Sequence, residues 1–171
     1  MIIEERVERS QYVKLITWIV SFIILMAGIV FPVLILWVNQ DMMSKVIGAS
    51  VLCLIFFTLI FTVAYQPRKL ILSETHIIME RILGQVYISY SDITDISLYH
   101  RENVAEIRIF GIGGLGGYIG KFYNSKIGFY TAYVGDYSQA FLIKINNREK
   151  YVMSSRHAEK IVEEVKSRLK Q

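Results

Sequence analysis

The residues best suited to chemistry form a glycine-rich run in the second half of the chain. The run Gly111-Ile112-Gly113-Gly114-Leu115-Gly116 has the G-x-G-x-x-G spacing of a dinucleotide-binding loop. Such a loop works because its glycines turn the chain from a strand into a helix, whose first N–H groups hold the pyrophosphate. The chemistry at issue is therefore phosphate binding by backbone amides. It requires a helix directly after the glycine run, so the residues that follow the run show whether it is possible.

These following residues predict strand and turn, not helix. Gly117, Gly120 and Gly128 continue the glycine spacing, Tyr123-Asn124-Ser125 favours a turn, and β-branched and aromatic residues then alternate. No acidic residue in a ribose-binding context stands about 20 positions further on. The Walker pattern also fails, because no Ser or Thr follows the Gly-Lys pair of this run. We therefore expect no nucleotide and no other cofactor.

The density of glycines calls for another explanation. Six of them lie within residues 111–120, which indicates backbone that bends sharply or passes close to other backbone. The apolar and aromatic residues between them would be displayed on a long loop between two strands. Two interpretations stay open: the loop folds back over its own domain or toward the bilayer, or it contacts lipid headgroups or a protein partner. The candidate contact residues are Gly113, Gly114, Gly116, Gly117, Tyr118, Lys121, Phe122, Tyr123 and Lys126.

Two uncharged runs dominate the first 65 residues. Residues 15–38 and 46–65 contain no Asp, Glu, Lys or Arg, over 24 and 20 positions. At about 1.5 Å rise per residue, either run is long enough to cross a hydrocarbon core of roughly 30 Å. Only residues 39–45 join them, so we expect an antiparallel transmembrane hairpin in the lipid bilayer. Without charged residues inside the spans, an anchor is favoured over a transporter.

The basic residues near the spans predict the orientation of the hairpin. Because Lys and Arg collect on the cytoplasmic side, we expect both termini there. The predicted organisation is a cytoplasmic segment at 1–14, the hairpin at 15–65 and a cytoplasmic domain at 66–171. Six basic residues flank the outer ends of the spans, whereas Lys45 alone lies in the connection at residues 39–45. The six are Arg6, Arg9, Lys14, Arg68, Lys69 and Arg81.

Residues 66–171 alternate in hydrophobicity with the period of strands and then change period. The final segment predicts an amphipathic helix that Ser155 can cap. The predicted fold class is mainly β with α, a strongly bent antiparallel sheet or barrel whose open end this helix closes. The candidate strands are residues 69–73, 76–82, 86–90, 93–100, 106–110, 128–134, 140–145 and 149–153, and the apolar helix positions are Ala158, Ile161, Val162, Val165 and Leu169.

This order of elements resembles a known family. The chain resembles membrane-anchored bacterial proteins with a pleckstrin-homology (PH)-like domain, and the resemblance covers residues 68–169. It rests on two spans, an extended domain containing the stretches FGIGGLGGYIGKFYNSKIGFYTAYV and AFLIKINNREKYVMSS, and a terminal helix. The resemblance implies a seven-stranded, two-sheet barrel capped by one helix, and no enzyme activity. It does not extend to phosphoinositide recognition, because the loop at residues 73–76 lacks the Lys and Arg that eukaryotic PH domains place there.

Titratable residues in the sequence predict neither catalysis nor a metal site. His76, His100 and His157 lie far apart, and Asp92 and Asp95 more simply provide acceptors for a turn. Residues 66–171 hold 15 Lys and Arg against 11 Asp and Glu, dispersed over several elements, which argues against nucleic acid as a partner.

We therefore expect a non-catalytic, membrane-anchored binding module at the cytoplasmic face. It would act as an adaptor for a protein partner or for the membrane surface, and a homo-oligomer stays open. The alternative is a hydrolase, or an accessory subunit of a membrane enzyme, with the glycine-rich loop near its site.

Overall fold

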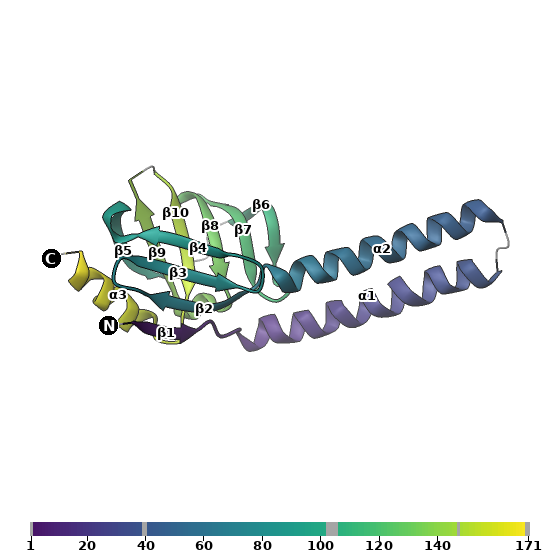
Figure 1. Cartoon of the computed structure of the whole chain (residues 1–171), viewed down its shortest axis with the longest axis horizontal. Coiled ribbons are helices and arrows are strands. Elements are labelled where there is room, and N and C mark those ends of the chain that lie inside the picture. The colour runs from purple at the N-terminus through teal and green to yellow at the C-terminus, as the bar shows by residue number, and fades with distance from the viewer. Residues whose placement is uncertain (1, 39–40, 102–105, 147, 170–171) are drawn as a thin grey trace.

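A long helical hairpin projects from a head made of two β-sheets and one helix (Figure 1). The computed structural model describes residues 2–38, 41–101, 106–146 and 148–169. Both ends of the chain lie at the head, and the turn of the hairpin lies at the far end of the molecule (Figure 1).

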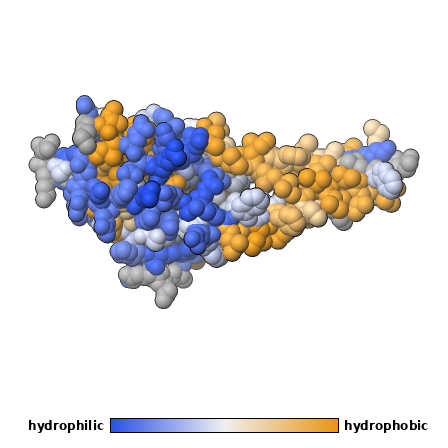
Figure 2. All heavy atoms as spheres, turned by 90° about the horizontal axis from the view of Figure 1, so that it is seen from below, coloured by the Kyte–Doolittle hydropathy of each residue, from blue (hydrophilic) through white to orange (hydrophobic). Residues whose placement is uncertain are grey.

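The hairpin consists of α1 (Gln11–Val38) and α2 (Met42–Ala64). Each begins four residues before its uncharged run because a polar side chain caps it. Ser10 Oγ accepts from the Val13 amide at 3.2 Å, and Asp41 Oδ2 from the Ser44 amide at 2.8 Å. Both helices are long and apolar enough to cross a membrane, by length and composition. Hydrophobic side chains cover the hairpin, whereas the face of the head seen in Figure 2 is mainly hydrophilic.

The smaller sheet has four antiparallel strands in the order β1-β2-β3-β4. These are β1 (Ile3–Arg6), β2 (Pro67–Leu72), β3 (His76–Arg81) and β4 (Gln85–Ser89). The sequence did not predict β1. Ile3 pairs with Leu72 and Arg6 with Lys69, so residues before the hairpin extend the same sheet as residues after it.

The larger sheet has six strands in the order β5-β9-β10-β8-β7-β6. They are β5 (Ile93–Tyr99), β6 (Glu106–Gly113), β7 (Tyr118–Asn124), β8 (Gly128–Val134), β9 (Ala140–Ile145) and β10 (Lys150–Ser154). The pair β10 and β8 is parallel and the other pairs are antiparallel. The expectation of a purely antiparallel arrangement is therefore wrong at this pair, because β10 inserts between β8 and β9.

The closed barrel expected from the resemblance does not form. A barrel requires its end strands to pair with each other. In the described chain, β1 instead covers the edge of β2, and β6 ends the larger sheet beside the end of α2 (Figure 1). The two sheets, the N-terminal helices and the C-terminal helix are confirmed, but the sheets stay separate.

The main core lies between the two sheets and α3 (Ala158–Arg168). The apolar stripe predicted for the last helix is confirmed at Ala158, Ile161, Val162 and Val165, which are all buried. The other buried members of this core are Leu70, Leu72, Ile77, Met79, Ile88, Ile93, Ile96, Phe141, Ile143 and Met153.

Candidate functional site

The glycine-rich run forms a β-hairpin, so the expectation of a long loop is wrong. β6 and β7 pair through it, and Gly111 lies directly opposite Gly120. A Cβ at Gly111 would lie 2.0 Å from the carbonyl oxygen of Ile119, and one at Gly120 would lie 2.3 Å from that of Phe110. Both glycines have φ near +120°. The close approach of backbone expected from the glycine density is confirmed at this pair.

The turn of this hairpin sits against the base of α1. The Gly116 amide donates to Thr17 Oγ1 at 2.8 Å, and this hydroxyl donates in turn to the Val13 carbonyl at 2.6 Å. The Gly114 amide donates to the Gly117 carbonyl at 2.9 Å and closes the turn. A turn amide of the glycine run is therefore satisfied by a helix side chain and not by a phosphate.

Gln66, which links α2 to β2, also contacts the segment before α1 and the turn of the glycine-rich hairpin. Its side chain is buried, and its Oε1 accepts a hydrogen bond from Nη2 of Arg9, which precedes α1. On its other side, a Cβ at Gly116 would lie 1.9 Å from Gln66 Nε2. The lack of a side chain at Gly116 is therefore what lets the turn close over the buried amide.

A second set of backbone contacts holds the head to both helices. The Ser10 amide donates to the Gly135 carbonyl at 3.2 Å, and a Cβ at Gly135 would lie 2.2 Å from the carbonyl oxygen of Glu8. On the α2 side, the Leu83 amide donates to the Ala64 carbonyl at 2.8 Å. We call these contacts, together with those of Thr17 and Gln66, the junction. The sequence analysis did not identify Gly135 or Gln66 as part of a site.

The nine candidate contact residues do not share one surface. Gly113 ends β6, and Gly114, Gly116 and Gly117 belong to the turn between β6 and β7, which lies at the junction. Along β7, Phe122 is only 3% exposed and lies in a second buried cluster. The remaining candidates are half-buried Tyr118, exposed Lys121, Tyr123, whose ring meets that of Phe129 edge to face with centroids 5.0 Å apart, and Lys126 in the turn after β7.

The second buried cluster contains a network of tyrosines on the outer face of the larger sheet. Tyr130 and Tyr137 hydroxyls lie 3.3 Å apart, and Tyr137 donates to Glu106 Oε1 at 3.1 Å. Asn124 Nδ2 donates to the Tyr99 hydroxyl at 3.2 Å. The Glu106 side chain is 4% exposed, and its other oxygen lies 3.1 Å from Arg101 Nε. The sequence analysis missed this network, of whose three tyrosines only Tyr130 lies in the alternating stretch GFYTAYV.

The tyrosines of this network are hydrogen-bond donors and not bases. Burial is the largest cause that raises the pKa of Tyr99, Tyr130 and Tyr137 above the ordinary phenol value. The phenols therefore stay protonated at neutral pH. Tyr137 donates to one oxygen of the buried Glu106 carboxylate, and the other oxygen forms the ion pair with Arg101 without a hydrogen bond. The network stabilises the outer face and offers no activated nucleophile.

Two of the residues considered in the sequence analysis, His157 and Asp95, form ion pairs with different partners. His157 Nδ1 lies 2.9 Å from Glu5 Oε1, and Asp95 Oδ2 lies 2.9 Å from Lys144 Nζ. Within the described ranges, no group of three or more His, Cys, Asp and Glu is placed to hold a metal ion.

A hollow of about 220 Å³ at the start of α3 brings together the side chains nearest to a hydrolase pattern. It is lined by His100, Ser138 and His157, among others. However, Ser138 Oγ donates to Asp136 Oδ1 at 2.8 Å, and His157 is held by Glu5. Nucleophilic catalysis needs the hydroxyl hydrogen-bonded to its base, and the described contacts give Ser138 a carboxylate instead.

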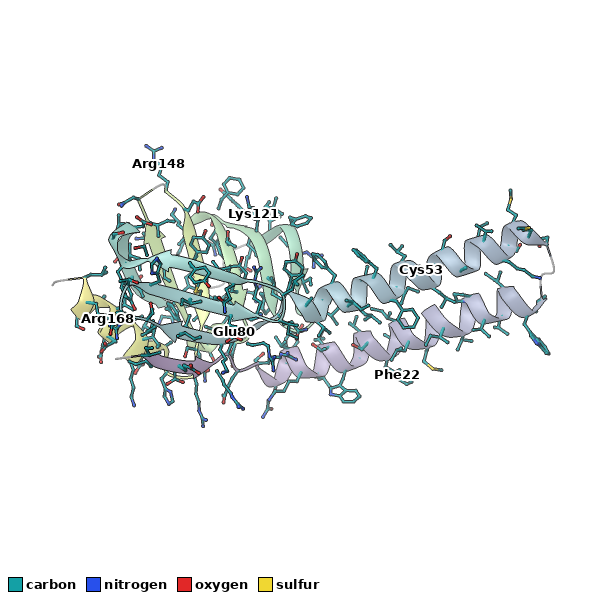
Figure 3. The ribbon with its side chains drawn as sticks, viewed as in Figure 1. Phe22, Cys53, Glu80, Lys121, Arg148 and Arg168 are labelled. Carbon is teal, nitrogen blue, oxygen red and sulfur yellow. The ribbon has the colours of Figure 1, made fainter. Side chains whose placement is uncertain are left out.

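A larger groove of about 580 Å³ lies on the larger sheet where the smaller sheet does not cover it. Exposed Ile109 and Phe129 contribute apolar surface. The polar lining has three basic residues, Lys121, Arg148 and Lys150, and one acidic residue, Glu149. Figure 3 shows Arg148 and Lys121 on the side of the head away from β1. We call this surface the basic groove.

Comparison with known proteins identifies the family. Residues 68–169 match the family described as Bacterial PH domain, and the chain belongs to this family. The curated proteins and the solved structures give no match. PH domains are generally non-catalytic binding modules.

The junction gives a first testable prediction. Thr17→Val removes the acceptor of the Gly116 amide and leaves that buried group unpaired, at a cost of about 1–3 kcal/mol. Hydrogen exchange of the amides at residues 114–117 in the full chain is expected to quicken by about 5- to 150-fold. Thr58→Val is the matched control, because Thr58 Oγ1 donates only to the Ile55 carbonyl of its own helix. Equal exchange rates in both variants would contradict the proposed contact.

The tyrosine network predicts a pH dependence. Above pH of about 10, tyrosines of the unfolded chain ionise, whereas the raised pKa keeps Tyr130 protonated in the folded head. Unfolding then releases a proton, so the free energy of unfolding falls as pH rises. Tyr130→Phe should make this fall shallower, by up to about 1.4 kcal/mol per pH unit. Urea unfolding of the full chain in detergent, across this pH range, measures the slope, and an unchanged slope counts against the prediction.

Proposed function

We propose that the protein is a membrane-anchored binding module, held in the bacterial cytoplasmic membrane by α1 and α2, whose head binds a protein partner on the cytoplasmic side. The family match supports a binding module, and the two apolar helices support the anchor. The basic residues flanking the spans support the cytoplasmic orientation.

The observation that carries the proposal is the junction. Hydrogen bonds from Gly116, Ser10 and Leu83 tie the head to both helices over a short distance. A head fixed in this way keeps one orientation relative to the bilayer, so its exposed surface is presented toward the cytoplasm at a fixed height. Binding at a defined position is what an adaptor supplies.

The basic groove is the surface best suited to a protein partner. Its three cations outnumber its single carboxylate, which favours an acidic segment. Ile109 and Phe129, the latter 67% exposed, offer contacts for an apolar side chain. The adjacent strand β6 pairs only with β7 in the described chain, so its outer edge is open to an added strand. We therefore propose an acidic, extended segment of a protein partner.

Site-specific photo-crosslinking in native membranes tests this function. A photoreactive residue replacing Phe129 should give discrete protein adducts, whereas one replacing exposed Glu163 on α3 should not. Lys121→Glu with Arg148→Glu should reduce the groove adducts about tenfold or more, because the change reverses two of the three cations. Lys160→Glu with Lys166→Glu, both exposed on α3, is the matched charge control. Identical adducts at both positions, or no effect of charge reversal, would overturn the groove as the binding surface.

A further inference from the structure

A small pocket lies where the head meets the end of α2. Its volume is about 140 Å³. Aromatic and aliphatic side chains form most of its wall, and Arg81 at the end of β3 is its one charged residue. Its lining is Phe61, Tyr65, Arg81, Phe110, Gly111, Ile112, Ile119, Gly120 and Tyr133.

Arg81 is held between two tyrosines but has no anionic partner among the described residues. Its guanidinium carbon lies 5.3 Å from the ring centroid of Tyr65 and 5.6 Å from that of Tyr133. Its Nε is buried and has no hydrogen-bond acceptor in the described chain. Stacking orients the guanidinium, yet a partly desolvated cation still calls for a counter-charge.

The other arginines that stack on tyrosines in the described head do have carboxylates. Arg101 lies over Tyr137 at 4.7 Å and within 3.1 Å of a Glu106 oxygen. Arg168 lies 2.8 Å from a Glu164 oxygen. Both of these stacked arginines are therefore paired with a carboxylate of the chain. Arg81 differs, because no Asp or Glu lines its pocket.

The position of the pocket indicates where its anion comes from. At about 1.5 Å per residue, the 23 residues of α2 extend roughly 35 Å, slightly more than the roughly 30 Å hydrocarbon core. The end of α2 and Tyr65 therefore fall at the headgroup layer, if the hairpin spans the bilayer as proposed. Ile82 and Leu83, beside that helix end, are exposed, and Phe110 at the pocket is 72% exposed.

We infer that this pocket binds the phosphate of an anionic phospholipid on the head's side of the bilayer. Arg81 donates to phosphate oxygens, as the planar guanidinium does well, and an acyl chain lies against Phe61 and Phe110. A zwitterionic headgroup fits less well because no carboxylate lines the pocket to receive its ammonium group. This site is separate from the basic groove, although it rests on the proposed membrane anchor.

Native mass spectrometry of the full chain in neutral detergent tests the site. We expect one equivalent of dioctanoyl phosphatidylglycerol to bind, about tenfold or more tightly than dioctanoyl phosphatidylcholine. Arg81→Gln should weaken phosphatidylglycerol binding about tenfold or more, and Arg81→Lys should restore part of it. Arg156→Gln is the matched control, since Arg156 is exposed and does not line this pocket.

Several outcomes would overturn the inference. The first is that Arg81→Gln binds phosphatidylglycerol as tightly as the unchanged chain. The second is that the unchanged chain binds phosphatidylcholine as tightly as phosphatidylglycerol. The third is that inorganic phosphate binds as tightly as phosphatidylglycerol. If Arg81→Gln does not fold, Phe110→Ala removes only the acyl contact and must still weaken phosphatidylglycerol binding. Failure of the anchor is a different result: the chain would then fractionate without detergent, whereas failure of this site leaves a membrane-inserted chain without lipid preference.

Discussion

The arrangement of this molecule depends on close contact of backbone at the junction. A Cβ at Gly116 would overlap the buried amide of Gln66, and a Cβ at Gly135 would overlap the carbonyl of Glu8. Because these positions carry no side chain, the head sits directly on the ends of both helices. The hydroxyl of Thr17 then accepts the turn amide that would otherwise be unpaired. Glycines whose spacing matches a phosphate loop thus serve to join a β-rich head to a helical hairpin.

The two faces of the larger sheet are covered by different groups. Buried tyrosines and the ion pair of Glu106 with Arg101 form a polar network on the outer face. The inner face is covered only in part by the smaller sheet and α3, and this leaves the basic groove open. In the described chain β6 also pairs with no strand other than β7. Because the two sheets do not close into a barrel, part of the larger sheet stays accessible to ligands. The open surfaces lie at the hairpin and at the groove, which is why we assign them to lipid and to protein.

The sequence predicted those elements whose signal is local. Eight of the ten strands in the described chain overlap the predicted ranges, and the helix stripe was correct, since alternation and a 3.6-residue period show directly in the residues. β1 was missed because its pairing depends on β2, more than 60 residues further along the chain. β7 was missed because the many glycines favoured a loop, whereas the direct pairing of Gly111 with Gly120 is set across two strands. Once β7 is a strand, Lys121 and Phe122 must point to opposite faces, so the candidate residues could not form one surface.

The most direct test of this account is the distance between head and hairpin. Spin labels at exposed Lys14 on α1 and exposed Lys121 on β7, with Cys53 replaced by Ser, would report it by pulsed electron paramagnetic resonance in lipid nanodiscs. A head fixed by the junction predicts one narrow distance distribution. A broad or multiple distribution, as expected for a head tethered by flexible linkers, would contradict the central claim.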